Sequence, residues 1–222
     1  MGFYAELRQE ADPIFEAIFA HPFVVELTSG RLAKERWAYY LCQDYQYLID
    51  FKQAVGLALV HLRSLDEIAV WESKVNAIVL EETRQHLEWG QQVGLTEEKM
   101  LEAEPDPAAL AYRQHTLLAG YRGIGPLCAA LVPCPTTYME IADRAADHIP
   151  DHPVFGKWVR IYSARLNPQL AEDIAWWIDT FDRLAAEAGP TEREEMRRNF
   201  MRSCKYEWMF WEMAYQAAGW PV

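Results

Sequence analysis

Cys134 is the residue that most clearly suggests chemistry, because it stands between two prolines in the segment 132–140. Pro133 disfavours helix at the residue before it, and Pro135 suits the first turn of a helix. The segment therefore predicts a helix that begins beside Cys134 and runs to about Asp147. A thiol at that end meets free N–H groups and the positive end of the helix dipole, which lower its pKa and favour the nucleophilic thiolate. The alternative is that Cys134 is a small apolar residue buried between helices.

Asp44 is a carboxylate set among aromatic rings. In the helix expected over residues 33–62 it shares one face with Tyr40 and Tyr47. Burying a carboxylate is costly unless something hydrogen-bonds to it, so its position suggests a binding role. The alternative is an exposed Asp44, or one that pairs with an arginine.

Glu207 repeats this arrangement within the aromatic run 206–211 of the last expected helix. Burial there would raise the pKa of its carboxyl group and suit it to act as a general acid near neutral pH. Glu212, one turn later, is the competing candidate. Tyr112 and Tyr162 also fall in apolar helical segments, where each is expected to be a core residue with a satisfied hydroxyl group.

Helices must position these groups, because helical periodicity dominates the chain and no alternating strand pattern is convincing. We expect one all-α domain, a helical bundle over residues 1–222. Proline, glycine and capping residues mark the boundaries: Pro13 bends or breaks the first helix, Asn167 caps one helix, and Thr191 opens a capping box for the last. The main expected helices span 3–20, 22–27, 33–62, 65–94, 107–122, 127–132, 134–147, 153–164, 168–189 and 191–218.

Composition excludes several classes of function. The 222 residues are 51% hydrophobic and carry a formal net charge of −12, which argues against a nucleic-acid surface. No apolar run is long enough to span a bilayer, and the amphipathic N-terminus is unlike a signal peptide. The four cysteines have no CxxC spacing, so reduced thiols in a cytoplasmic protein are expected.

Metal and haem sites find little support. A di-iron carboxylate protein needs Glu-x-x-His on two helices, and the nearest match is a single pair, Glu82 and His86, four residues apart. His61, His86 and His115 are expected to be core or surface residues. Nothing marks an axial haem ligand, so neither metal nor cofactor is expected.

Four motifs nevertheless resemble the TenA/THI-4 family, whose members are thiaminase II or aminopyrimidine aminohydrolase. The likeness covers nearly the whole chain in the right order, and the cysteine places it with the cysteine-bearing branch. The matching residues are Cys42-Gln43-Asp44-Tyr45-Gln46-Tyr47-Leu48, Leu131-Val132-Pro133-Cys134 with Tyr138, Trp158 with Tyr162-Ser163, and Cys204-Lys205-Tyr206-Glu207 with Phe210-Trp211-Glu212-Met213-Ala214.

The resemblance implies a haem-oxygenase-like fold without haem, commonly in a homotetramer. It implies hydrolysis of 4-amino-5-aminomethyl-2-methylpyrimidine to the hydroxymethyl pyrimidine in thiamin salvage, and many members also cleave thiamin. The family's nucleophile maps onto Cys134 and its pocket carboxylates onto Asp44 and Glu207. Its pocket tyrosines map onto Tyr47, Tyr112, Tyr138 and Tyr162.

A covalent mechanism fits these residues. Thiolate addition to the electron-poor ring breaks its aromaticity and lets the ring electrons expel the leaving amine. Cys134 would add to the ring, Glu207 would transfer protons, and Asp44 would hold the exocyclic amine, although the two carboxylates could exchange roles.

One departure and two alternatives remain open. Family members often carry an aromatic residue just after the cysteine, where this chain has Pro135-Thr136-Thr137, which affects the pocket and the exact substrate. The alternatives are a non-catalytic pyrimidine-binding or regulatory protein, and a cofactor-free oxidase of the pyrroloquinoline quinone synthase type. The latter would need a basic, histidine-rich pocket, and the sequence does not indicate one.

Overall fold

The computed structural model describes residues 2–221, of which 74, 75 and 77–79 are described by their backbone alone. Every regular element in this range is an α-helix, which confirms the predicted fold class. The helices are α1 (Phe3–Glu10), α2 (Asp12–Phe19), α3 (Pro22–Thr28), α4 (Lys34–His61), α5 (Leu65–Val93), α6 (Glu97–Glu102), α7 (Pro107–Arg122), α8 (Ile124–Leu131), α9 (Pro133–Ala145), α10 (Phe155–Tyr162), α11 (Pro168–Glu187) and α12 (Pro190–Gln216).

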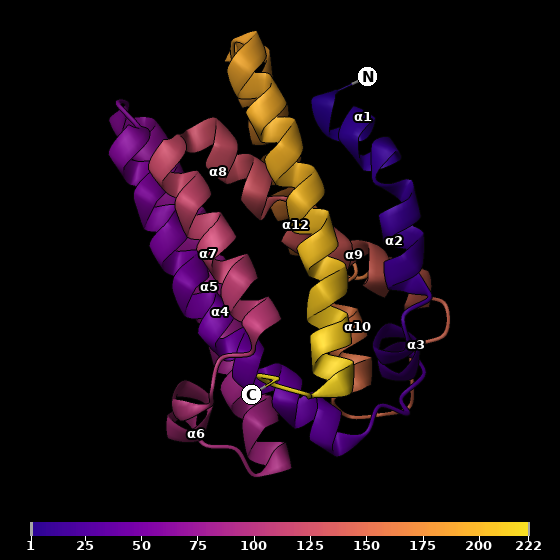
Figure 1. Cartoon of the computed structure of the whole chain (residues 1–222). Helices are drawn as coiled ribbons and strands as arrows, with labels where there is room; N and C mark the ends of the chain where they lie inside the picture. The colour runs from indigo at the N-terminus through magenta and orange to yellow at the C-terminus, as the bar shows by residue number, and fades with distance from the viewer. Residues whose placement is uncertain (1, 222) are drawn as a thin grey trace.

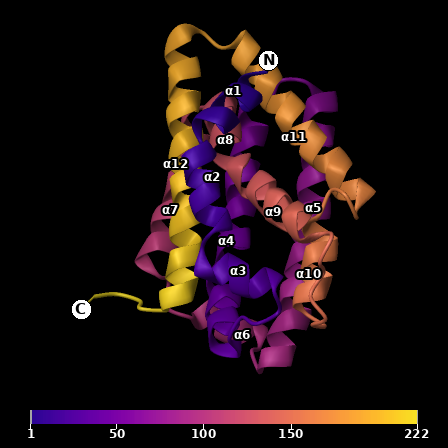
Figure 2. The same ribbon diagram turned by 90° about the vertical axis from the view of Figure 1, so that its right-hand side faces the viewer.

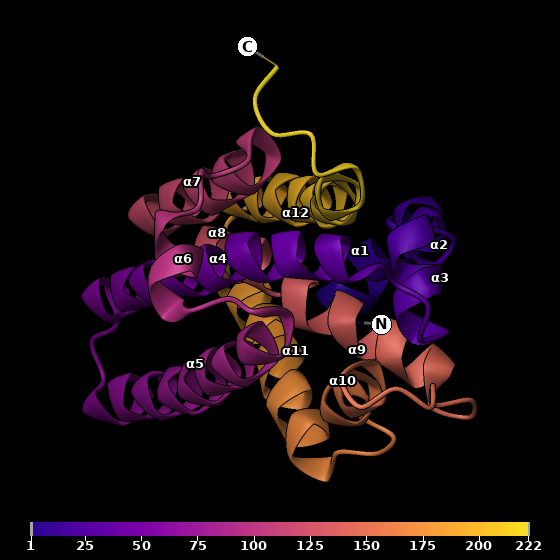
Figure 3. The same ribbon diagram turned by 90° about the horizontal axis from the view of Figure 1, so that it is seen from below.

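The long helices form a layered bundle around α4. Helix α4 packs against α5 on one side and α7 on the other, and α12 packs against α7 and α8 (Figures 1 and 3). The shorter helices α1 to α3 pack along α12, and α9 and α10 lie against each other near α3. Helix α11 reaches α5 through Trp71, whose ring lies 5.3 Å from that of Trp176 and 5.4 Å from that of Trp177 (Figure 2).

Local signals explain most of the boundaries. The first helix is broken as predicted, since α1 ends at Glu10 and α2 begins at Asp12 with Pro13 in its first turn. Asn167 caps α11, where its side chain accepts a hydrogen bond of 3.3 Å from the N–H of Leu170.

Three predicted starts are wrong. Helix α12 begins at Pro190 and its N-cap is Gly189, so Thr191 does not form the predicted capping box. A proline fits the first helical position, where its missing N–H costs nothing. Helix α8 begins at Ile124 and includes Pro126 in its first turn, instead of starting after this proline as predicted. The missing N–H of Pro126 costs nothing in the first turn. Helix α10 begins at Phe155, two residues after the predicted start.

An aromatic core joins the helices that carry the candidate residues. The ring of Tyr40 on α4 stacks on Trp37 at 4.9 Å and on Trp211 of α12 at 5.8 Å. Tyr138 of α9 packs against Trp211 at 5.1 Å. Since aromatic pairs of this kind add about 0.5–1.5 kcal/mol each beyond their buried area, α4, α9 and α12 are held at one place.

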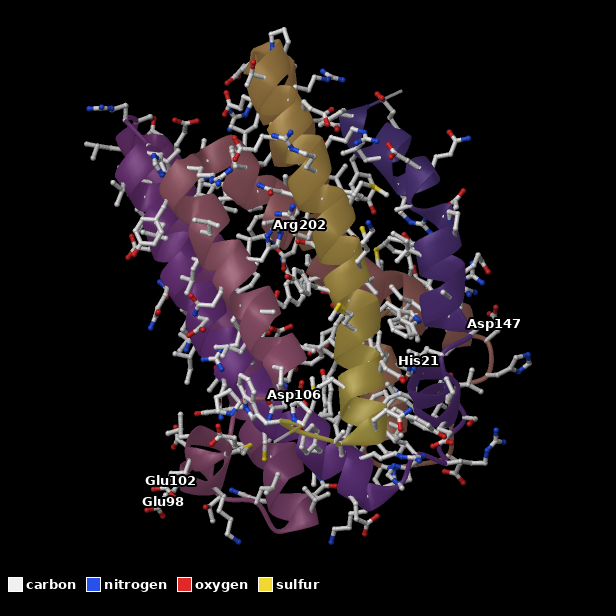
Figure 4. All side chains as sticks on the ribbon, viewed as in Figure 1. His21, Glu98, Glu102, Asp106, Asp147 and Arg202 are labelled. Atoms are coloured by element: carbon white, nitrogen blue, oxygen red, sulfur yellow. The ribbon has the colours of Figure 1, made fainter. Side chains whose placement is uncertain are left out.

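Much of the surface is acidic. Figure 4 shows Glu98 and Glu102 on the outer side of α6, pointing away from the bundle, and both are exposed. Within residues 2–221, no helix combines the length and apolar character that crossing a membrane requires.

Exposed apolar side chains gather where α4 ends, α5 begins and α7 ends. Tyr121 is 73% exposed and Val60 is 74% exposed, and the ring of His61 holds the two helix ends together through the carbonyl of Gly120 at 2.8 Å. Leu65, at the start of α5, is also exposed. An apolar cluster of this kind favours contact with a second copy.

We therefore expect the predicted oligomer in solution, and light scattering at micromolar concentration should report it. Tyr121→Glu should shift the protein towards monomer, because association would bury a charge. Glu98→Gln, on the surface of α6, is the control and should leave the mass unchanged. A monomeric wild-type protein contradicts this prediction.

Candidate functional site

A cavity opens between α4, α5, α9, α10 and α11. The empty space between its walls, including the part open to solvent, is about 620 Å³. Aromatic and aliphatic side chains form most of its wall, and a few polar groups point into it. The lining residues are Asp44, Tyr47, Leu48, Phe51, Glu82, Cys134, Pro135, Tyr138, Tyr162, Leu170, Asp173, Ile174 and Trp177.

Five of the seven residues predicted for the site line this cavity, namely Cys134, Asp44, Tyr47, Tyr138 and Tyr162. The other two, Glu207 and Tyr112, do not line it. They lie behind its wall and bind each other, with the Tyr112 hydroxyl donating to Oε1 of Glu207 at 2.7 Å. The Glu207 carboxyl group interacts electrostatically with both Tyr47 and Cys134. The pair formed by Glu207 and Tyr112 therefore adjoins the cavity near the Cys134 thiol.

Glu207 has the raised pKa that its aromatic surroundings predict. Its side chain is almost wholly buried, and burial raises the pKa of the carboxyl group to about 8, against the opposing effect of the bond from Tyr112. Glu207 is therefore largely protonated at neutral pH and can donate a proton. Glu212, the competing candidate, is partly exposed and pairs with Nε2 of His21 at 3.0 Å, away from the cavity.

The predicted activation of Cys134 by a helix N-terminus is wrong. The residue is at the second position of α9, but α8 runs directly into α9 because Val132 between them has helical angles. The flanking Pro133 and Pro135 supply no N–H groups. Burial raises the pKa of the thiol well above its usual value, and nearby carboxyl groups, Glu207 foremost, raise it further. The resting thiol is neutral, so a reaction must include a base that removes its proton.

Asp44 is held by two short hydrogen bonds. Its Oδ2 accepts from the Tyr40 hydroxyl at 2.7 Å and lies 2.6 Å from Nε2 of His86, a fully buried residue of α5. The Tyr40 hydroxyl also lies 2.9 Å from that of Tyr138. These hydrogen bonds offset the free-energy cost of burying the carboxylate. Asp44 is therefore neither exposed nor paired with an arginine, which were the alternatives from the sequence.

The His86 ring reveals where the protons are. Its Nδ1 lies 2.7 Å from the backbone carbonyl of Glu82, which can only accept, so Nδ1 carries a hydrogen. Burial lowers the pKa of His86, but the bond to Asp44 and the Glu82 carbonyl outweigh burial and raise it. The geometry therefore suits an imidazolium that donates from Nε2 to an ionised Asp44.

Tyr47 has the one cavity-lining hydroxyl among the described residues that is buried and without a hydrogen-bond partner. Such groups cost free energy until they are satisfied, so this hydroxyl is available to a bound molecule or to the adjacent thiol of Cys134. Tyr162 lies beside the Glu82 carboxyl group, and burial together with the charge of Glu82 raises the pKa of its hydroxyl group.

Sequence reasoning missed Glu82 and His86 as site residues. It weighed the pair only as metal ligands. The structure confirms His86 as a core residue, but its hydrogen bonds to Asp44 and to a backbone carbonyl were not predicted. The spacing of four residues was a usable signal, because it puts both side chains on one face of α5. The wall from α11, which includes Asp173, Ile174 and Trp177, had no distinctive pattern.

Known proteins resemble this chain over its whole length. The profile of the TENA/THI-4/PQQC family matches residues 8–217. The aminopyrimidine aminohydrolase of Halalkalibacterium halodurans is 31% identical over 99% of this chain and 98% of its own. That of Bacillus subtilis strain 168 is also 31% identical, over 99% of this chain and 92% of its own.

Solved structures agree with the sequence comparison. A TenA homologue from P. horikoshii OT3 superimposes with a TM-score of 0.88 at 27% identity, covering 98% of this chain and all of that one. A domain from Shewanella denitrificans OS217, described as having a heme oxygenase-like fold, has a TM-score of 0.57 at 14% identity over 96% of this chain and 92% of its own. The fold is therefore heme oxygenase-like, and the chain belongs to the TENA/THI-4/PQQC family.

Proposed function

We propose that this protein hydrolyses 4-amino-5-aminomethyl-2-methylpyrimidine to 4-amino-5-hydroxymethyl-2-methylpyrimidine and ammonia, with Cys134 as the nucleophile. The observation that carries the proposal is the position of the Cys134 thiol, which faces an aromatic cavity that also contains Asp44 and adjoins a protonated Glu207. The names of the relatives at 31% identity support the same substrate.

Asp44 orients the ring. One oxygen is occupied by Tyr40 and His86, which leaves the other free for the exocyclic amine of the pyrimidine. The rings of Tyr138 and Tyr162, 5.2 Å apart, supply an aromatic wall against which the pyrimidine packs. The Tyr47 hydroxyl offers a further donor on the same side as the thiol.

Cys134 and Glu207 carry out the addition together. Sγ bonds to the ring carbon beside the one that bears the aminomethyl group, while Glu207 protonates a ring nitrogen and receives the thiol proton in exchange. This exchange explains how a neutral thiol acts as a nucleophile. The electrons of the dearomatised ring then expel the protonated aminomethyl nitrogen as ammonia and form an exocyclic double bond.

Water completes the reaction. Its oxygen bonds to the methylene carbon and one of its protons ends on the released ammonia, while the Cys134 sulfur leaves the ring and aromaticity returns. Glu207 takes back the proton from the ring nitrogen and restores that of the thiol. The net reaction consumes one amine and one water and forms one alcohol and one ammonia, with no oxidation or reduction.

The two alternatives fit this cavity less well. Among the described residues, its lining contains three acidic side chains, Asp44, Glu82 and Asp173, and no basic one, which disfavours the polyacidic substrate of a pyrroloquinoline quinone synthase. A purely regulatory protein would bind the pyrimidine without consuming it. Incubation with the aminomethyl pyrimidine separates these cases, because only the proposed hydrolase releases ammonia.

Cys134→Ser should abolish nearly all ammonia release, since a hydroxyl group is a far weaker nucleophile than a thiolate. The variant should still bind the hydroxymethyl pyrimidine in calorimetry. Cys42→Ser, at another half-buried cysteine, is the matched control and should keep wild-type turnover. Activity in Cys134→Ser would rule out the covalent mechanism.

Glu207→Gln should lower kcat by about a hundredfold to ten-thousandfold, the usual contribution of a general acid, with little change in product affinity. Because the protonated form donates, wild-type kcat should fall as pH rises through about 8, the pKa of Glu207. This decline should be absent from the variant. Glu212→Gln is the control, one turn further along α12, and a loss of kcat there as large as in Glu207→Gln would contradict the assignment.

Asp44→Asn should weaken binding of the hydroxymethyl pyrimidine as well as slow turnover. An amide accepts less strongly than a carboxylate, and it has only one acceptor oxygen for His86 and the exocyclic amine. The expected loss is about tenfold or more in affinity, measured by calorimetry. If affinity stays at the wild-type level, Asp44 does not hold the ring.

A further inference from the structure

Glu82, like Asp173, is a carboxyl group of the cavity that the steps above leave unused. We propose that Glu82 binds the cationic amine of the substrate and exchanges protons with the leaving group and with the attacking water. The inference rests on the proposed function, because it names the residue that acts on the amine which that function removes.

The position of Glu82 fits this role. Its side chain lines the cavity from α5, and its charge interacts with both Asp44 and Cys134, so the three groups surround one space. In the substrate the exocyclic amine and the aminomethyl group are on adjacent ring carbons. A ring whose amine binds Asp44 therefore presents its aminomethyl group beside Asp44, where Glu82 is the next carboxyl group.

The charge of the cavity favours a cation at this point. In the part of the chain whose side chains are described, no lysine, arginine or histidine lines it, and Asp173 on α11 adds a third acidic group to the wall. The neighbouring imidazolium of His86 is occupied by Asp44. Tyr162 lies beside Glu82, and the lone pairs of the ionised carboxylate suit an ammonium group.

Glu82 can also change its charge near neutral pH. Burial raises the pKa of its carboxyl group to about 7, with His86 opposing the shift and Asp44 adding to it. The groups that face it are His86 on its own helix, Asp44 on α4, Cys134 on α9 and Tyr162 on α10. A carboxyl group with a pKa near the working pH suits proton exchange in both directions.

The assignment completes the proton balance of the second half-reaction. As the C–N bond breaks, the nitrogen leaves with its bonding electron pair as ammonia. When water attacks the methylene carbon, its proton passes to the Glu82 carboxylate. Glu82 then gives this proton to the departing ammonia, which leaves as ammonium, and the carboxylate is restored. Glu207 remains responsible for the ring nitrogen and the thiol.

The test compares a cationic and a neutral ligand that share one ring. In the Cys134→Ser background, which does not turn over, calorimetry measures binding of the aminomethyl and the hydroxymethyl pyrimidine at about pH 6 and about pH 8. We expect the amine to bind more tightly at the higher pH, where Glu82 is ionised and a primary amine is still largely protonated. Adding Glu82→Gln should weaken amine binding at about pH 8 by about tenfold or more and leave alcohol binding unchanged.

Glu81→Gln is the matched control, because Glu81 neighbours Glu82 on α5 but is exposed. It should change neither affinity. Since His86 and Asp44 also interact electrostatically beside the cavity, comparing the variants at each pH removes their shared effect. If Glu82→Gln weakens binding of the amine and of the alcohol equally, Glu82 has a structural role and the proposal fails. Unchanged amine affinity in this variant would also overturn the proposal.

Turnover gives an independent measure. In the protein with Cys134 intact, Glu82→Gln should lower kcat/KM for the aminomethyl pyrimidine by about a hundredfold and remove the rise in rate through about pH 7. If the wild-type protein releases no ammonia, the proposed function fails, but the binding comparison still decides whether Glu82 recognises the amine. The two failures are therefore distinguishable.

Discussion

The bond between Asp44 and His86 is the interaction on which the site depends. It joins the middle of α4 to α5 at 2.6 Å inside an aromatic core, where an unpaired carboxylate would cost several kcal/mol. The Glu82 carbonyl fixes the other ring nitrogen, so the imidazolium cannot turn away from Asp44. Because Tyr40 and Tyr138 extend the same network, the bond also aligns α9, the helix that carries Cys134, with the cavity.

Several acidic groups around one thiol impose a second constraint. Asp44, Glu82 and Glu207 all act on Cys134, and like charges at short range cannot all be ionised in a medium of low dielectric constant. The structure separates their roles by environment. Asp44 has a cationic partner, Glu82 lies beside Tyr162 with a pKa of about 7, and Glu207 is more deeply buried with a pKa of about 8. These environments make Asp44 a fixed anion, Glu82 a group that exchanges protons and Glu207 a general acid at one cavity.

The sequence predicted most of the fold because its boundaries are local. Proline and capping residues such as Pro13 and Asn167 act within one turn, and the long helices have clear apolar faces. The errors have non-local causes. The pKa of Cys134 depends on carboxyl groups from three other helices and on a continuous α8–α9 junction, which no spacing within 132–140 reveals. His86 likewise acquires its role from Asp44, 42 residues earlier in the chain.

The chain has Pro135-Thr136-Thr137 where family members often carry an aromatic residue after the cysteine, and packing limits what this difference changes. Only Pro135 lines the cavity, whereas both threonines are buried behind it, and the hydroxyl of Thr136 donates to the Val132 carbonyl at 2.9 Å. The departure therefore alters the shape of one wall and leaves its charge unchanged. Opposite this wall, α11 contributes Ile174 and Trp177, which are held by core packing. Selection for a cationic leaving group must then come from the acidic side chains of the cavity, while the size of the group is limited by Pro135 and α11.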